Sequence, residues 1–189
     1  MDKLIHYDIA LFSKINGEWH NQFFDWFFPL MRNQFTWAPL YLFTLVFILQ
    51  HFKWKGFGWI SFFLITFAIT DMCSSSLIKP LAGRLRPCAD PMLADTVRAI
   101  VGCGGKWSFP SSHAANHFGL AMFSFQTLLF IPLRWRWLLF LWAAVICYAQ
   151  MYIGVHFPID IFCGALLGCT VGYATGTLFN KKVGLGSLA

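Results

Sequence analysis

A histidine and an aspartate lie four residues apart in the C-terminal part of the chain, at His156 and Asp160. A carboxylate at this spacing can accept the Nδ1–H of the imidazole and leave Nε2 free as a nucleophile. The simpler alternative is that Asp160 caps a helix beside an interfacial histidine. Taken alone, the pair is compatible with covalent catalysis and with capping.

A second histidine follows a short polar run, Pro110-Ser111-Ser112-His113, directly before an apolar segment. The first backbone N–H groups of a helix bind anions, and serine hydroxyls add hydrogen-bond donors. A histidine at this place can act as a general acid. Helix capping by serine, with a histidine satisfied in the protein, is the alternative.

A third cluster carries positive charge at the end of another apolar segment. Lys79 and Arg86 offer a point charge and a planar donor fork, which proteins use to hold phosphate oxygens. Snorkelling of both side chains toward a membrane surface is the alternative. Together the three clusters combine two histidines, an acid and a basic cradle, which favours phosphoryl transfer over the separate structural explanations.

The order and spacing of these residues resemble the type 2 phosphatidic acid phosphatase family. The matching patterns are Lys79 with Arg86-Pro87, then Pro110-Ser111-x-His113, then His156 with Asp160. This family is the membrane branch of the superfamily that contains vanadium haloperoxidases and bacterial acid phosphatases. The resemblance covers about residues 60–175, which is most of the chain.

The resemblance implies a role for each matching residue. His156 would accept the phosphoryl group with Asp160 orienting it, and His113 would protonate the leaving oxygen and then activate water. The phosphate-binding residues would be Lys79, Arg86, Ser111, Ser112 and Gln150. No metal and no cofactor are expected, because fixed cations stabilise the phosphoryl charge.

Two positions depart from the family pattern. Ser112 stands where the family usually has glycine, and Ala149-Gln150 stand where it has Ser-Arg. Gln150 can donate hydrogen bonds but brings no charge, so its phosphate contact should be weaker by a few kcal/mol, about 1.5–3 on the scale of charged hydrogen bonds. Arg84 is a candidate to supply the missing charge.

The composition places these motifs in a membrane protein. Of 189 residues, 58% are apolar, 19% aromatic and 12% charged, against about 25% charged in soluble domains. The net charge of +6 is too scattered for a nucleic-acid surface, so no nucleic-acid partner is expected.

The apolar runs predict an all-α integral membrane helical bundle with about five transmembrane helices and N-terminal interfacial helices. The expected spans are roughly 36–51, 57–78, 114–132, 137–153 and 159–179. Residues 2–16 are amphipathic, and residues 21–32 are too short and too charged to span, although a six-span alternative would use them. The domains are then 1–33 (interfacial helices), 34–182 (phosphatase core, with an active-site loop at about 80–110) and 183–189 (tail).

Basic residues in short loops predict the orientation. One side of a five-span chain carries Lys53, Lys55, Arg134, Arg136, Lys181 and Lys182 without acids, which indicates the cytoplasmic side. The other side also carries many basic residues, some of them in the phosphate cradle. The expected location is the bacterial inner membrane, with the active site on the outer, periplasmic side.

Several smaller features have two interpretations. Cys88 and Cys103 share the polar loop and would pair if it faces an oxidising compartment. Close helix packing is predicted by a glycine at every fourth position, within the bundle by default or in a homo-oligomer: Gly164, Gly168, Gly172 and Gly176. Asp71 supports Lys79 or bonds a neighbouring helix, and His117 is expected in packing or in a bond near the site.

The expected partners are the bilayer and a lipid substrate. Family resemblance suggests undecaprenyl pyrophosphate, phosphatidylglycerol phosphate, phosphatidic acid or lipid A, with the isoprenyl pyrophosphate ranked first because the chain is small. A lipid-binding or transport protein with weakened catalysis is an alternative class, motivated by Gln150. A vanadate-dependent oxidative enzyme is a third class, which the membrane spans disfavour.

Overall fold

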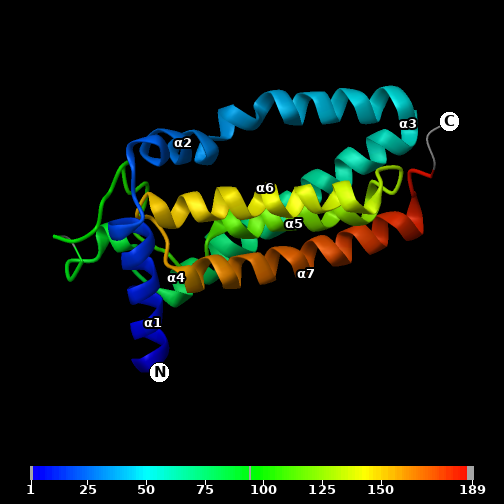
Figure 1. Cartoon of the computed structure of the whole chain (residues 1–189). Coiled ribbons are helices and arrows are strands. Elements are labelled where there is room, and N and C mark those ends of the chain that lie inside the picture. The colour runs from blue at the N-terminus through cyan, green and yellow to red at the C-terminus, as the bar shows by residue number, and fades with distance from the viewer. Residues whose placement is uncertain (1, 94, 187–189) are drawn as a thin grey trace.

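The computed structural model describes residues 2–93 and 95–186, and it confirms an all-α fold (Figure 1). Residues 187–189 of the predicted tail lie outside the described residues. The long helices are α1 (Asp2–Ser13), α2 (Gln22–Arg32), α3 (Gln34–Asp71), α5 (Ser112–Thr127), α6 (Leu133–Tyr152) and α7 (Pro158–Lys182). Shorter elements are the π-helical turns Lys14–Glu18 and Met72–Ile78, α4 (Lys79–Ala82) and the 3-10 turn Pro87–Ala89.

Helix α3 is two helices joined at a sharp reversal. Lys53 has φ 47° and ψ −121°, which breaks the helix between the two apolar runs that the sequence separated. The halves cross so closely that a Cβ at Gly56 would lie 2.7 Å from the carbonyl oxygen of Ile48. The second half then packs against α5 and α7.

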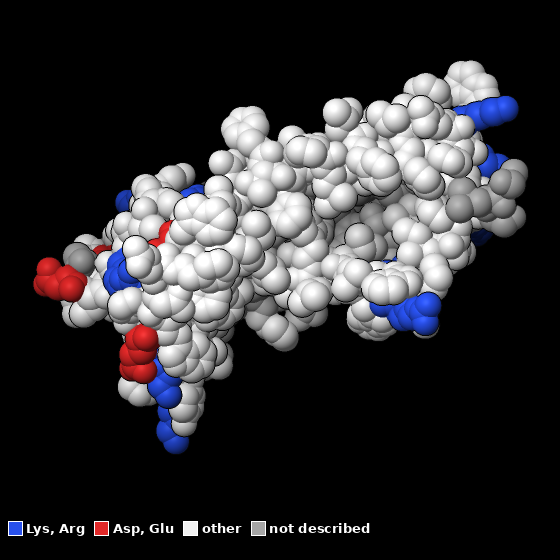
Figure 2. Space-filling model, turned by 45° about the horizontal axis from the view of Figure 1, so that its top comes forward, with Lys and Arg blue, Asp and Glu red and all other residues white. Residues whose placement is uncertain are grey.

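Among the described residues, two helices are long and apolar enough to cross a membrane, Gln34–Ala82 and Pro158–Lys182. The first of them contains the reversal at Lys53. In Figure 2 charged side chains gather toward the two ends of the molecule and leave a broad uncharged middle. The apolar middle agrees with a membrane bundle, whereas the number of five spans stays a prediction.

The glycine face of α7 packs against α5 within the same chain. A Cβ at Gly168 would lie 2.2 Å from the carbonyl oxygen of Ala115, and one at Gly172 would lie 2.2 Å from that of Gly119. Small residues thus allow the two backbones to touch. Since α5 occupies this face, the glycines serve the default interpretation, and the face is not open for the homo-oligomer that the sequence also allowed.

Gly168→Ala is expected to destabilise the bundle, because its methyl group would meet backbone atoms that cannot rotate away. Overpacking of this kind costs about 1–3 kcal/mol. The measurement is the thermal midpoint of the purified protein in detergent. Gly102→Ala is the matched control, since nothing lies within 4 Å of a Cβ at that position. Equal midpoints for both variants would contradict the proposed α5–α7 contact.

The two N-terminal helices differ from each other. Helix α1 lies across the bundle axis at the end where α5 and α7 begin, as an interfacial helix would (Figure 1). Helix α2 instead packs along α6, because the ring of Phe28 contacts those of Tyr148 and Tyr152 in tilted pairs at centroid distances of 5.2 and 4.7 Å. Residues 21–32 are therefore tied to the bundle by their aromatic side chains.

Candidate active site

Helix ends and loops at one end of the bundle carry all the predicted site residues. Lys79 begins α4, Arg86 lies in the following loop, and His113 lies in the first turn of α5. His156 lies between α6 and α7, and Asp160 lies in the first turn of α7. Their charges act on one another: Asp160, Arg86 and Lys79 all influence His156. The three sequence clusters thus form one site.

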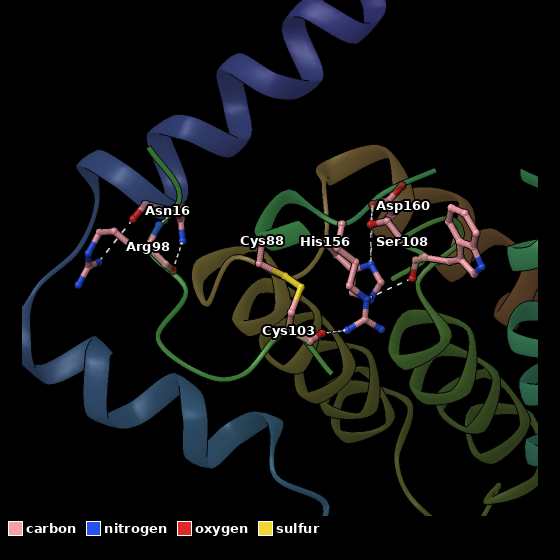
Figure 3. The surroundings of a disulfide bond; sticks show 9 residues. Asn16, Cys88, Arg98, Cys103, Ser108, His156 and Asp160 are labelled. Carbon is pink, nitrogen blue, oxygen red and sulfur yellow. Dashed lines mark hydrogen bonds and ion pairs between the residues drawn. A yellow bond between two sulfur atoms is a disulfide. The ribbon is translucent and has the colours of Figure 1, made fainter. Parts of the chain in front are cut away.

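Ser108 lies between the histidine and the aspartate (Figure 3). Its Oγ is 3.2 Å from His156 Nδ1 and donates a hydrogen bond to Asp160 Oδ2, while Nδ1 and Oδ2 are 3.7 Å apart. Because the Ser108 hydroxyl donates its hydrogen bond to Asp160, its oxygen can accept a hydrogen bond from Nδ1–H of His156. This arrangement leaves Nε2 unprotonated, as a nucleophile requires.

Burial keeps the imidazole of His156 neutral. His156 is 1% exposed. Burial lowers its pKa to about 4, against the opposing effects of the hydrogen bond and charge of Asp160. The ring is therefore unprotonated and able to attack at neutral pH.

Asp160 both caps a helix and orients a histidine, so the two interpretations of the sequence hold together. Its Oδ2 accepts the backbone N–H of Phe157 at 2.9 Å. Its Oδ1 accepts Arg84 Nη1 at 2.8 Å. The carboxylate is fully buried and paired with a cation, which stabilises its charged form.

The sequence suggested that Arg84 supplies the charge missing at Gln150, but the structure shows Arg84 bound to two carboxylates. Its second nitrogen, Nη2, binds Asp8 Oδ2 of α1 at 2.5 Å. Asp8 in turn accepts the backbone N–H of Ile159 at 2.8 Å. With one carboxylate on each terminal nitrogen, Arg84 holds the aspartate in place and is not free for phosphate.

The start of α5 has the geometry of an anion site. Ser111 is the N-cap residue, and its Oγ accepts the backbone N–H of Ala114 at 3.3 Å. Since Ser111 Oγ acts as the acceptor in this bond, its O–H group remains available to donate a hydrogen bond to a ligand. Ser112 Oγ is buried without a partner among the described residues. Both hydroxyls can therefore donate to an anion beside His113.

Asp71 of α3 and His117 of α5 each form a hydrogen bond with a residue of α5 near the candidate site. Asp71 Oδ1 accepts Asn116 Nδ2 at 3.0 Å, and its charge also reaches Lys79. Asp71 thus bonds a neighbouring helix, and its support of Lys79 stays a prediction. His117 Nδ1 is hydrogen-bonded to the carbonyl oxygen of His113 at 2.8 Å, which agrees with a packing role near the site.

Arg86 is held by two carbonyl oxygens of the polar loop. Its Nε donates to Trp107 O at 3.1 Å, and its Nη1 donates to Cys103 O. Cys103 forms a disulfide with Cys88, as predicted for an oxidising compartment (Figure 3). The disulfide therefore fixes the segment that positions the Arg86 guanidinium.

Reducing this disulfide is expected to lower kcat/KM about tenfold, the effect of weakening one charge-assisted hydrogen bond. The measurement compares the kinetics of the wild type and of a Cys88→Ser/Cys103→Ser variant, each with and without reductant. Reductant should affect only the wild type. Unchanged kinetics in the reduced wild type would show that Arg86 is positioned without the disulfide.

Gln150 lies fully buried in α6, and neither side-chain atom, Nε2 nor Oε1, has a hydrogen-bond partner among the described residues. An unpaired buried amide costs about 1–3 kcal/mol, so a group able to bind it is expected to enter the site. Sequence reasoning identified Gln150 but missed Ser108 and Asp8. Their only signal was that Ser108 closely precedes Pro110 and that Asp8 interrupts an amphipathic helix.

Comparison with known proteins agrees with this geometry. The model of the PAP2 superfamily matches residues 59–183. A lipid A 4′-phosphatase of Bacteroides thetaiotaomicron is 37% identical over 85% of this chain and 72% of that protein. One of Porphyromonas gingivalis is 33% identical over 92% and 73%. An undecaprenyl-diphosphatase of Sulfolobus acidocaldarius is 34% identical over 35% of this chain and 31% of that protein.

Two solved structures share the architecture. Aquifex aeolicus LpxE has a TM-score of 0.64 and 28% identity, covering 88% of this chain and 93% of that one. A transmembrane PAP2 type phosphatidylglycerolphosphate phosphatase of Bacillus subtilis has a TM-score of 0.70 over 97% and 89%; at 20% identity it supports the fold alone. The family resemblance seen in the sequence is thereby confirmed: the chain belongs to the PAP2 superfamily and is a membrane lipid phosphatase.

Proposed function

We propose that this phosphatase hydrolyses the 4′-phosphate ester of lipid A. The supporting observation is that two relatives named lipid A 4′-phosphatases match most of the chain at 37% and 33% identity. This proposal replaces the first rank that the sequence gave to undecaprenyl pyrophosphate, which stays the second candidate on a shorter match of 68 residues.

The proposed reaction has two steps on the same histidine. His156 Nε2 attacks phosphorus, the bond between phosphorus and the lipid oxygen breaks, and His113, which receives a proton from the bound phosphate monoester, gives that proton to the lipid oxygen. His113 then takes a proton from water, which attacks the phosphohistidine and releases inorganic phosphate and free His156. Lys79 and Arg86 stabilise the negative charge on the phosphoryl oxygens, so activity is expected in EDTA.

The proposed setting is a bacterial inner membrane with the site at its outer, periplasmic face. Five spans follow if the two halves of α3 cross separately and α5, α6 and α7 each cross once. The reversal of α3, the start of α6 and the end of α7 carry the basic residues of the predicted cytoplasmic side: Lys53, Lys55, Arg134, Arg136, Lys181 and Lys182. The lipid tails would stay in the bilayer while the headgroup reaches His156.

The test is phosphate release by the purified protein in detergent with EDTA. The panel contains lipid A, undecaprenyl pyrophosphate, phosphatidylglycerol phosphate and phosphatidic acid. We expect the highest kcat/KM with lipid A and loss of the 4′-phosphate. A preference for the isoprenyl pyrophosphate would support the second candidate. Binding without release from any lipid would instead support the lipid-binding or transport class.

A further inference from the structure

Arg32, the last residue of α2, lies beside the phosphate cradle although no family motif contains it. Gly104 shows the proximity, because a Cβ there would lie 3.5 Å from Arg86 Nη1 and 3.8 Å from Arg32 Nη2. Two guanidinium groups from distant parts of the chain therefore border the same point of the loop. Burial lowers the pKa of His113, and the positive charge of Arg32 is among the smaller effects in the same direction.

The Arg32 guanidinium has no carboxylate partner among the described residues. It is half-buried, and burial lowers its pKa. Burial, followed by the nearby charge of Arg32, also lowers the pKa of Arg86. Two partly desolvated cations repel each other, and an anion bound to both would relieve this repulsion. By contrast, Arg84 and Arg98 each bind a carboxylate.

The end of α2 is held firmly enough to present Arg32 at a fixed place. Phe28, one helical turn earlier, packs against Tyr148 and Tyr152, which lie one turn apart on the same face of α6. On the other side of Arg32, Trp37 Nε1 donates to the carbonyl oxygen of Met31 at 2.7 Å. Packing against α6 and the bond from Trp37 therefore hold Arg32 at the end of the bundle that carries the candidate site.

We propose that Arg32 binds a non-bridging oxygen of the scissile phosphoryl group and supplies the positive charge that Gln150 lacks. This inference rests on the proposed phosphatase site but not on the identity of the lipid. Arg32 and Arg86 hold the phosphoryl group from the loop side, and the unpaired Gln150 amide and Ser112 hydroxyl donate from the bundle side. The fork of an arginine suits such an anion better than a lysine ammonium does.

The first test measures binding of orthovanadate, a phosphate mimic, from the shift in thermal midpoint of the detergent-purified protein. Arg32→Gln is expected to weaken vanadate binding about 10- to 100-fold, because it removes a charged hydrogen-bond donor. Arg32→Lys is expected to weaken it by less, because lysine keeps the charge but lacks the donor fork. Arg134→Gln, an exposed arginine at the far end of the bundle, is the matched control and should bind vanadate like the wild type. Wild-type vanadate affinity in Arg32→Gln would overturn the proposal.

The second test asks whether an arginine introduced at position 150 of α6 can replace the positive charge of Arg32. In the Arg32→Gln background, Gln150→Arg is expected to recover at least about tenfold in kcat/KM or in vanadate affinity, the value of one charge-assisted contact. If Arg32→Gln loses activity while vanadate affinity stays at the wild-type level, Arg32 acts elsewhere and the proposal fails. Because vanadate binding is measured without turnover, a wrong lipid assignment would leave this result readable.

Discussion

His156→Ala is expected to lower kcat/KM for lipid phosphate by at least about 10³-fold, because the variant lacks the atom that accepts the phosphoryl group. The residual rate would come from the cradle alone. Vanadate or phosphate binding should fall much less, since Lys79 and Arg86 are intact. The measurement is initial-rate kinetics in detergent with EDTA, beside the thermal midpoint of each variant.

His51→Ala is the matched control, since His51 lies exposed on α3 and bonds only the carbonyl oxygen of Phe47 among the described residues. It should keep wild-type kinetics. His156 is buried, so alanine leaves a cavity, and the thermal midpoint shows whether the variant is folded. A folded His156→Ala protein with more than a tenth of wild-type activity would exclude His156 as the nucleophile.

His113→Ala is the second variant with a large expected effect, and its effect should depend on the leaving group. With a lipid phosphate, whose alkoxide needs a proton, kcat should fall about 10²–10⁴-fold. With p-nitrophenyl phosphate, whose phenolate leaves without one, the first step should persist. The second step still lacks its base, so phosphoenzyme should accumulate after a burst of p-nitrophenol.

The readout is rapid-mixing absorbance with the wild type and His113→Ala side by side. His117→Ala serves as the neighbouring-histidine control, because His117 contacts the backbone of His113 and the ring of Trp142. It should show no burst beyond that of the wild type. If His113→Ala slowed both substrates equally and gave no burst, its role as acid and base would be wrong.

The sequence predicted the site motifs because they are short and local. His156 with Asp160 and Ser111 with His113 each fall within one loop or helix start, and their spacing already indicated one helix-terminal geometry. A break between the apolar runs 36–51 and 57–78 also followed from the sequence, and the structure places it at Lys53. The order of the predicted spans also put the basic residues that follow the first, third and fifth spans at one end of the bundle.

Contacts over long sequence distances could not be predicted in this way. Ser108 lies 48 residues from His156, and Asp8 lies 76 residues from Arg84, so no local pattern announces either contact. Arg84 was misjudged for this reason, because its two carboxylate partners come from α1 and α7. A regular glycine spacing shows that two helices touch but not which helix is the partner, which here is α5.

The contacts of the N-terminal helices α1 and α2 with the candidate site could not be predicted from local sequence either. Their amphipathic pattern predicted helices at the membrane surface, yet Asp8 of α1 binds Arg84 and Arg32 of α2 lies near Arg86. In the sequence, the charged residues of these helices cannot be told from ordinary surface charge. Only the fold shows that both helices place charged side chains at the end of the bundle that carries the candidate site.

The most direct test of the central claim is to find where the phosphoryl group resides during turnover. Purified protein is mixed with lipid phosphate, quenched in alkali to preserve phosphohistidine, digested and analysed by mass spectrometry, with His156→Ala in parallel. The expected result is a phosphoryl group on His156 in the wild type, enriched in His113→Ala and absent from His156→Ala. Phosphate release at the wild-type rate without a modified His156, or with the phosphoryl group on another residue, would contradict the mechanism.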